Sequence, residues 1–301
     1  MTLGYDKPIY ILAFDHRSSF QKMLGITAKE PSPEEIERTQ DAKGLIFEGF
    51  QSAITQGVAK ENAGVLTDEQ YGSEVARKAK ADSVNLAMPV EKSGQNEFDF
   101  EYGDQFGEHI EDFNPDFSKV LVRYNPAGDP DMNKGQTERL RRLSDWLHER
   151  ERKFLFELLV PAEEDQLASV EGDVERYDTE LRPGLMKQSI KQLLAGGVDP
   201  DIWKIEGIDS RDECSEIADL VRGDGKSGVS CVVLGRGADD MKVDEWLRAA
   251  AGLDGYIGFA IGRSIFGDSI KGYGSGSINR VDAVNLVAQK YKRFIDVYEK
   301  G

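Results

Sequence analysis

The sequence predicts one α/β domain over residues 1–301, a single parallel (β/α)8 TIM barrel. Short apolar runs rich in β-forming residues alternate with amphipathic stretches along the chain. Most of these runs are continuous, as expected for strands that are buried on both faces. Eight such units follow one another without interruption, which favours closure into a barrel. An open doubly wound sheet is the alternative, but no glycine-rich dinucleotide fingerprint follows the first strand.

The expected elements alternate in type, which implies parallel strands. The strands are expected at Ile9–Asp15, Gly64–Asp68, Ser83–Met88, Lys119–Asn125, Lys153–Val160, Ile202–Gly207, Ser230–Gly235 and Gly255–Gly262. Helices are expected at Thr137–Arg150, Gly184–Leu194, Arg211–Arg222, Lys242–Ala251 and Asn279–Tyr298. Three connections are long: Arg17–Gln40, Pro89–Ser118 and Pro161–Pro183. Such loops are often lids or binding loops, and a surface insertion without function is an equally good interpretation.

Composition limits the partners that the chain can have. Hydrophobic residues make up 39% and charged residues 31% of the 301 residues, as in a soluble globular protein. The net charge of -17 disfavours binding to nucleic acid or to an anionic membrane. Cys214 and Cys231 show neither metal spacing nor a disulfide framework, and no targeting or membrane-spanning segment is found. We therefore expect a cytoplasmic protein, and a homo-oligomer remains open.

Polar residues gather at the predicted carboxyl ends of the strands, where barrel enzymes place their active sites. They are Asp15, Asp68, Arg123, Asn125, Glu157, Lys204 and Glu206. Alternation along a strand puts Lys204 and Glu206 on one face, and likewise Arg123 and Asn125. Because buried charges are costly unless they are paired, this set predicts a functional polar cluster, in which Arg123, Asp68, Asn125 and Glu206 are expected to bind the substrate.

Lys204 is the candidate nucleophile. Its alternative role is a structural ion pair with Glu206 or Glu157. A neighbouring cation such as Arg123 in a partly dry site favours the neutral amine, which can attack a carbonyl. Glu157 and Asp15 would pair with this amine or act as general acid and base. Lys119 and Lys153 begin their strands, so they are expected at the opposite end of the barrel, out of reach of the substrate.

Two Gly-Arg pairs follow the last two strands. They lie in Gly235-Arg236-Gly237 and Gly262-Arg263. Phosphate sites of such barrels are commonly built from these two loops. Glycine lets backbone N–H groups approach an anion, and arginine adds a permanently charged fork. The pairs therefore predict a phosphate site.

Six segments together resemble a known enzyme family. They are Leu12-Ala13-Phe14-Asp15-His16-Arg17, Val120-Leu121-Val122-Arg123-Tyr124-Asn125-Pro126, Phe156-Glu157-Leu158-Leu159-Val160-Pro161, Trp203-Lys204-Ile205-Glu206-Gly207, Leu234-Gly235-Arg236-Gly237 and Gly258-Phe259-Ala260-Ile261-Gly262-Arg263. The chain resembles class I (Schiff-base) aldolases of the tagatose 1,6-bisphosphate aldolase group, and is closest to the aldolase domain for 5-keto-2-deoxygluconate 6-phosphate. The resemblance implies that Lys204 forms the iminium, that Glu157 is the acid/base and that the Gly-Arg loops hold phosphate. The tagatose enzymes carry a lysine at the position of Arg123, which we therefore expect to bind a phosphate or carboxylate.

The expected activity is a metal-independent aldehyde-lyase reaction on a phosphorylated or otherwise anionic keto sugar or keto sugar acid. It would release dihydroxyacetone phosphate and an aldehyde. The histidines His16, His109 and His148 form no metal set, which disfavours a zinc-dependent class II aldolase, and no cofactor is expected. A transaldolase is one alternative. A non-catalytic sugar-phosphate-binding barrel, which needs Arg236 and Arg263 but no reactive Lys204, is another.

Overall fold

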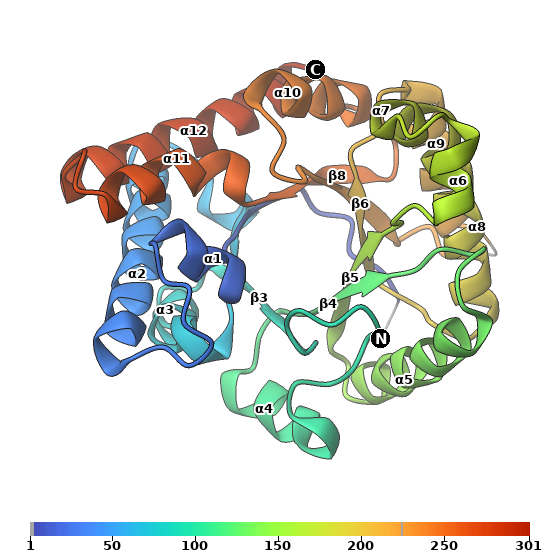
Figure 1. Cartoon of the computed structure of the whole chain (residues 1–301), viewed down its shortest axis with the longest axis horizontal. Coiled ribbons are helices and arrows are strands. Elements are labelled where there is room, and N and C mark those ends of the chain that lie inside the picture. The colour runs from blue at the N-terminus through green and yellow to red at the C-terminus, as the bar shows by residue number, and fades with distance from the viewer. Residues whose placement is uncertain (1–2, 224) are drawn as a thin grey trace.

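The computed structural model describes residues 3–223 and 225–301 and contains a closed barrel of eight parallel strands, β1 to β8 in chain order (Figure 1). The fold prediction is confirmed. The strands are β1 (Ile9–Ala13), β2 (Ala63–Leu66), β3 (Asn85–Pro89), β4 (Phe117–Arg123), β5 (Lys153–Leu159), β6 (Ile202–Glu206), β7 (Ser230–Leu234) and β8 (Tyr256–Ile261). Their ends differ from the predicted ones by no more than two residues.

Helices form a ring around the strands, as Figure 1 shows. The main ones are α2 (Pro33–Thr55), α3 (Glu69–Ala81), α4 (Phe106–Phe113), α5 (Pro130–Glu149), α8 (Arg182–Ala195), α9 (Arg211–Val221), α10 (Asp240–Ala250), α11 (Arg263–Gly274) and α12 (Arg280–Lys300). Helix α2 begins earlier than the predicted connection to Gln40 allows. Ser32 and Glu35 form a capping box at its start and Pro33 takes its first position, a strong local signal for a helix N-terminus.

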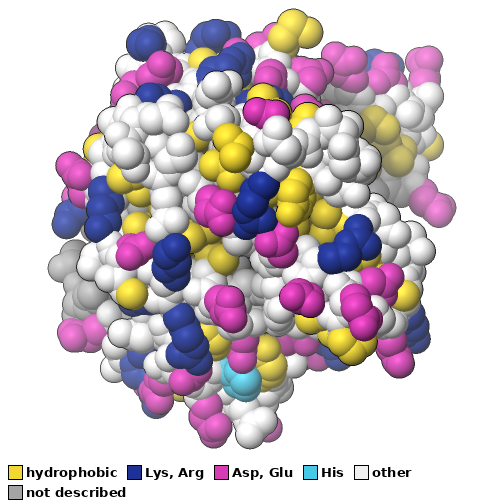
Figure 2. Space-filling view, turned by 90° about the vertical axis from the view of Figure 1, so that its left-hand side faces the viewer, with side chains coloured by type: hydrophobic (Ala, Val, Ile, Leu, Met, Phe, Trp, Pro, Cys, Tyr) yellow, Lys and Arg dark blue, Asp and Glu magenta, His cyan; other side chains and the backbone are white. Residues whose placement is uncertain are grey.

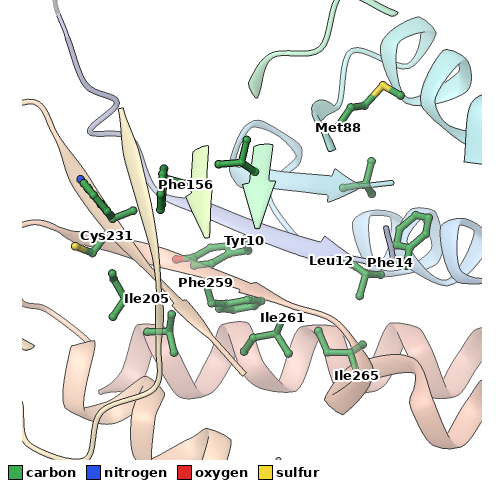
Figure 3. Close-up of a cluster of buried hydrophobic side chains, with 14 of the residues drawn as sticks. Tyr10, Leu12, Phe14, Met88, Phe156, Ile205, Cys231, Phe259, Ile261 and Ile265 are labelled. Atoms are coloured by element: carbon green, nitrogen blue, oxygen red, sulfur yellow. The ribbon is translucent and has the colours of Figure 1, made fainter. Parts of the chain in front are cut away.

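Alternation along the strands separates two apolar layers. Tyr10, Leu12 and Ile205 point outward and pack under the helices, as Figure 3 shows. Ile11 and Ile202 point inward and belong to a smaller cluster that fills the barrel. This interior cluster also contains Ile9, Ala13, Leu66, Ala87, Phe117, Leu155, Val232 and Ala260. Residues that continue the inward face toward the carboxyl ends of the strands are polar, and they build the site described below.

The three long connections contain short elements of their own. The first contains α1 (Ser18–Met23), and the third contains α6 (Glu164–Ser169), α7 (Val174–Arg176) and the π-helix η3 (Tyr177–Leu181). In the second, an isolated antiparallel bridge joins Glu91 to Phe100. The 3-10 helices η1 (Lys60–Asn62) and η2 (Gly103–Gln105) complete the order of elements.

The surface is charged and mixed. Figure 2 shows acidic and basic side chains interspersed over one side of the molecule. None of the helices in the described ranges is long and apolar enough to cross a membrane.

Candidate active site

A cavity of about 690 Å³ opens at the carboxyl ends of the strands. All three long connections contribute to its wall, through residues such as Arg17, Glu91 and Asp178. The sequence-predicted residues that line it are Asp15, Arg123, Glu157, Lys204, Glu206, Arg236, Gly237, Gly262 and Arg263. The structure therefore brings most of the predicted set together around one cavity.

Lys204 lies in the wall of this cavity on β6, one layer above the inward-facing Ile202. Its residue is 3% exposed. Glu157 is its Cα partner on the neighbouring strand β5, and the Lys204 Nζ and Glu157 Oε2 atoms are 3.0 Å apart. The strand register thus fixes an amine beside a carboxylate at the opening of the barrel.

The prediction that Lys119 lies out of reach at the far end of the barrel is wrong. Strand β4 begins two residues earlier, at Phe117, and the inward-facing Lys119 side chain lies in the cavity wall. Its Nζ is 2.8 Å from Asp15 Oδ2, 2.7 Å from Glu91 Oε1 and 3.0 Å from Glu157 Oε2. We call Lys119, Asp15, Glu91 and Glu157 the Lys119 cluster.

Charge interactions inside the Lys119 cluster separate the roles of its members. Burial opposes the charge on Lys119, but Asp15, Glu157 and Glu91 together raise the pKa of this amine well above its usual value. Burial likewise opposes ionisation of Asp15 and Glu157, yet Lys119 lowers the pKa of both carboxyls. Lys119 is therefore an ammonium ion, and these two carboxylates are held ionised around it.

Glu91 belongs to the site but was missed in the sequence. The bridge to Phe100 fixes its backbone, and Arg17 Nη2 donates a hydrogen bond to its carbonyl at 3.1 Å. Burial raises the pKa of its carboxyl, opposed by Lys119. The signal that could have found it is a carboxylate two residues after β3, at the same end as Asp15 and Lys204.

Of the three histidines, His16 lines the cavity. Its Nδ1 is 4.0 Å from Asp15 Oδ1. Burial lowers the pKa of His16 to about 4, so the ring is neutral at neutral pH. In the part of the chain that the structure describes, no three His, Cys, Asp or Glu residues are grouped so as to hold a metal ion.

The two Gly-Arg loops touch one another, and parts of both line the cavity. Arg263 Nη2 donates a hydrogen bond to the Arg236 carbonyl at 3.1 Å. Gly237 has a φ of +74°, and a Cβ there would lie 3.0 Å from the Arg263 guanidinium carbon. A Cβ on Gly262 would lie 2.2 Å from the Ala13 carbonyl oxygen, so only glycine fits at the start of α11. The uncapped helix start and Arg263 make an environment suited to an anion.

Arg236 occupies a different environment from Arg263. Its Nη1 donates a hydrogen bond to Asp178 Oδ2 at 2.6 Å, and its Nε is 3.1 Å from Glu206 Oε1. Glu206 also accepts a hydrogen bond from the Val160 N–H at 2.9 Å. The Arg236 guanidinium thus ties the third long connection to the ends of β6 and β7, and it is neutralised by carboxylates of the protein itself.

Among the predicted substrate-binding residues, Arg123 lies in the cavity wall, whereas Asp68 and Asn125 do not. Arg123 lines the cavity, and its Nη1 donates a hydrogen bond to the Gln95 carbonyl at 2.9 Å. Asp68 does not line it: it forms an ion pair with the buried Lys43 and caps α3 by accepting from the Tyr71 N–H.

Asn125 is likewise absent from the cavity wall. Strand β4 ends at Arg123, so the alternation of faces stops before Asn125. Its amide donates to the Pro161 carbonyl at 2.8 Å and to Gln166 at 2.7 Å, and so holds the third connection in place. Gly235, the remaining predicted phosphate residue, does not line the cavity, and a Cβ there would lie 3.1 Å from Ile261. Asp68, Asn125 and Gly235 thus lie outside the cavity wall, and their predicted contacts with the substrate stay predictions.

Comparison with known proteins supports the fold. One similar solved structure is a Schiff-base-forming fructose-1,6-bisphosphate aldolase, with a TM-score of 0.55, 16% identity, and coverage of 96% of this chain and 94% of that chain. Another is a protein from Corynebacterium glutamicum (Brevibacterium flavum), with a TM-score of 0.59, 16% identity, and coverage of 97% and 88%. At this identity the likeness shows the barrel fold alone.

Sequence comparison gives the family. A search of the curated proteins gave no match. A family model described as "Uncharacterized protein conserved in bacteria (DUF2090)" matches residues 5–301. Because this match spans almost the whole chain, the protein belongs to the DUF2090 family.

Proposed function

We propose that this protein is a class I aldolase of the cytoplasm, built as one domain, in which Lys204 forms a Schiff base with an anionic keto sugar or keto sugar acid. The observation that carries the proposal is the placement of Lys204. Its amine lies in the wall of a cavity and has an ion pair with Glu157, while the neighbouring Lys119 holds the other nearby carboxylates. The resemblance to the tagatose 1,6-bisphosphate aldolase group and the aldolase with a similar fold agree with it.

The substrate phosphate would bind at the start of α11. Backbone N–H groups there are free of a side-chain cap, Gly262 and Gly237 permit close approach, and Arg263 supplies the charge. Arg236 supports this site through its carbonyl, which accepts from Arg263. Arg123 would contact the other end of the substrate, since it lines the same cavity from β4.

The reaction begins when the neutral Lys204 amine attacks the ketone carbon. A carbon–nitrogen bond forms, the ketone oxygen leaves as water, and a protonated imine remains. Glu157 and Asp15 serve as acid and base for these proton transfers. The next carbon–carbon bond then breaks, its electrons enter the iminium to give an enamine, and the hydroxyl proton passes to a carboxylate of the Lys119 cluster. Protonation of the enamine and hydrolysis release dihydroxyacetone phosphate.

Trapping of the imine tests the proposal. Borohydride added with dihydroxyacetone phosphate should reduce the imine and attach a three-carbon fragment to the protein. A non-catalytic sugar-phosphate-binding barrel would bind the ligand without being labelled. A transaldolase would be labelled too, but it would release little free dihydroxyacetone phosphate without an acceptor aldehyde.

A further inference from the structure

Glu91 lines the cavity, but it has no role in imine formation as described above. Its side chain is 11% exposed, and its Oε1 accepts a hydrogen bond from Lys119 at 2.7 Å. Its Oε2 is buried and has no hydrogen-bond partner among the described residues. A carboxylate oxygen in this situation is poorly stabilised in its ionised form, so Glu91 accepts a proton at little cost.

The charge balance of the Lys119 cluster points the same way. Three carboxylates contact Lys119, and Lys204 contacts one of them. Even when both lysines are protonated, they neutralise two carboxylates, which leaves one carboxylate in excess. Arg17 is the other cation that faces Glu91, but its Nη2 bonds the Glu91 carbonyl and its Nη1 pairs with Glu101.

Glu91 is the least neutralised of these three carboxylates. Burial raises its pKa and the nearby Asp15 adds to the effect, although Lys119 and Arg17 oppose it. The pKa values of Asp15 and Glu157 are lowered instead. When the pKa values of two carboxyls in one site are shifted in opposite directions, the carboxyl with the higher pKa is the better proton acceptor. Glu91 is thus the strongest base among the carboxylates around Lys119.

The position of Glu91 fits the end of the substrate where a proton must move. With the phosphate bound beside β7 and β8 and the imine on β6, as proposed above, the rest of the carbon chain would extend past β5 and β4 toward β3. Glu91 follows β3 and contacts Lys119 of β4. In this binding mode, the hydroxyl on the far side of the breaking bond would lie nearer to Glu91 than to the phosphate loops.

Resting on the aldolase function proposed above, we propose that Glu91 is the residue that accepts the hydroxyl proton when the carbon–carbon bond breaks. The electrons of the O–H bond form the aldehyde carbonyl, and those of the carbon–carbon bond enter the iminium to give the enamine. The proton moves to the Glu91 carboxylate. In the reverse direction, protonated Glu91 returns it to the alkoxide of the new bond, and no further reactant is needed.

Two reactions of dihydroxyacetone phosphate test this assignment. Exchange of its α-hydrogen in heavy water needs the imine and enamine but no hydroxyl proton transfer, whereas condensation with an aldehyde that the wild type accepts needs both. Glu91→Gln keeps the size of the side chain and an acceptor for Lys119. We expect this variant to keep the exchange rate within about threefold of wild type. We expect condensation to fall by roughly 10²–10⁴-fold.

The controls separate this role from a structural one. Glu111→Gln removes an exposed carboxylate from the same connection outside the cavity and should leave both reactions unchanged. Glu91→Asp keeps a carboxylate and should recover part of the condensation that Glu91→Gln loses. Equal losses of exchange and condensation in Glu91→Gln would show that Glu91 merely holds Lys119 in place. Unchanged condensation would exclude it as the proton acceptor. Absence of exchange and of imine in the wild type would instead overturn the aldolase function, and this inference with it.

Discussion

Lys119 and Lys204 are the same kind of side chain, yet their surroundings differ. Both amines lie 3.0 Å from the same atom, Glu157 Oε2, and both line the cavity. Lys119 has two further carboxylate partners, Asp15 and Glu91. A lysine enclosed by three carboxylates stays charged and organises the acids around it. The Lys204 amine has one such contact, which leaves positions around it for a substrate carbonyl. Under the proposed function, Lys119 is the structural cation of the site and Lys204 is the nucleophile.

The largest expected effect follows from removing the nucleophile. Lys204→Met should abolish imine formation and turnover while the fold is retained. Lys204→Arg is the matched control for charge: it keeps the ion pair with Glu157, but a guanidinium stays protonated and cannot attack a carbonyl. Both variants should be inactive in a dihydroxyacetone phosphate release assay, with unchanged circular dichroism. Wild-type activity in Lys204→Met would exclude Lys204 as the nucleophile.

Lys119→Met should damage the fold as well as the activity. It leaves three buried carboxylates without their shared cation, which we expect to cost about 3–5 kcal/mol in the free energy of unfolding. In the wild type, the lowered pKa values of Asp15 and Glu157 give stability above their unfolded pKa of about 4, and this stability is lost as the pH falls through the folded values.

The pH dependence makes this prediction specific. Without Lys119, burial raises the pKa of the same carboxyls, so stability falls as the pH rises. The difference in melting temperature between wild type and Lys119→Met should therefore grow between about pH 5 and about pH 8. A difference that shrinks over this range would show that Lys119 does not neutralise these carboxylates.

Glu157→Gln should affect turnover more strongly than imine trapping. The amide keeps contact with both lysines, but it cannot accept or return a proton. Some imine should still be trapped, but more slowly, because Glu157 serves the proton transfers that form and hydrolyse it, and turnover should fall by roughly 10²–10⁴-fold. Trapping yield and steady-state rate measured on one preparation give the two quantities. A variant that loses both equally would show that Glu157 mainly positions Lys204.

Arg263→Ala and Arg236→Ala should have different effects, because the two side chains have different partners. Arg263→Ala should raise KM by the equivalent of roughly 1.5–3 kcal/mol, the usual value of a charged hydrogen bond. Arg236→Ala, which breaks contacts with Asp178 and Glu206, should instead lower the melting temperature. Inorganic phosphate protection against heat, measured for both variants, would distinguish them. An unchanged KM in Arg263→Ala would contradict the phosphate assignment.

The smallest effect is expected from metal removal. A Schiff base already provides the electron sink that a metal ion would otherwise supply, so dialysis against a chelator should leave turnover unchanged. Loss of activity that zinc restores would place the protein in the metal-dependent class of aldolases.

Periodicity predicted the barrel because strands buried on both faces leave long apolar runs, and all eight were found within two residues of their ends. It also placed Lys204 and Glu206 on one face, and both line the cavity, since alternation is regular inside a strand. Prediction failed where strands begin or end. Lys119 was assigned to the wrong end because β4 starts at Phe117, and Asn125 lies beyond the end of the same strand.

Partners far apart in sequence account for the other differences. Nothing near Asp68 in the chain reveals that its carboxylate pairs with Lys43. Glu91 was missed because it belongs to a connection, where no periodicity indicates which side chains face a cavity. Arg236 was predicted beside a phosphate, but Asp178, which engages it, lies in the π-helix of a distant connection.

The most direct test of the central claim is to identify the lysine that carries the trapped fragment. Borohydride reduction with dihydroxyacetone phosphate, followed by peptide mapping, gives each lysine the same opportunity to react. We expect a three-carbon adduct on the peptide containing Lys204 and none on the peptide containing Lys119. An adduct on Lys119, or labelling that persists in Lys204→Met, would contradict this expectation.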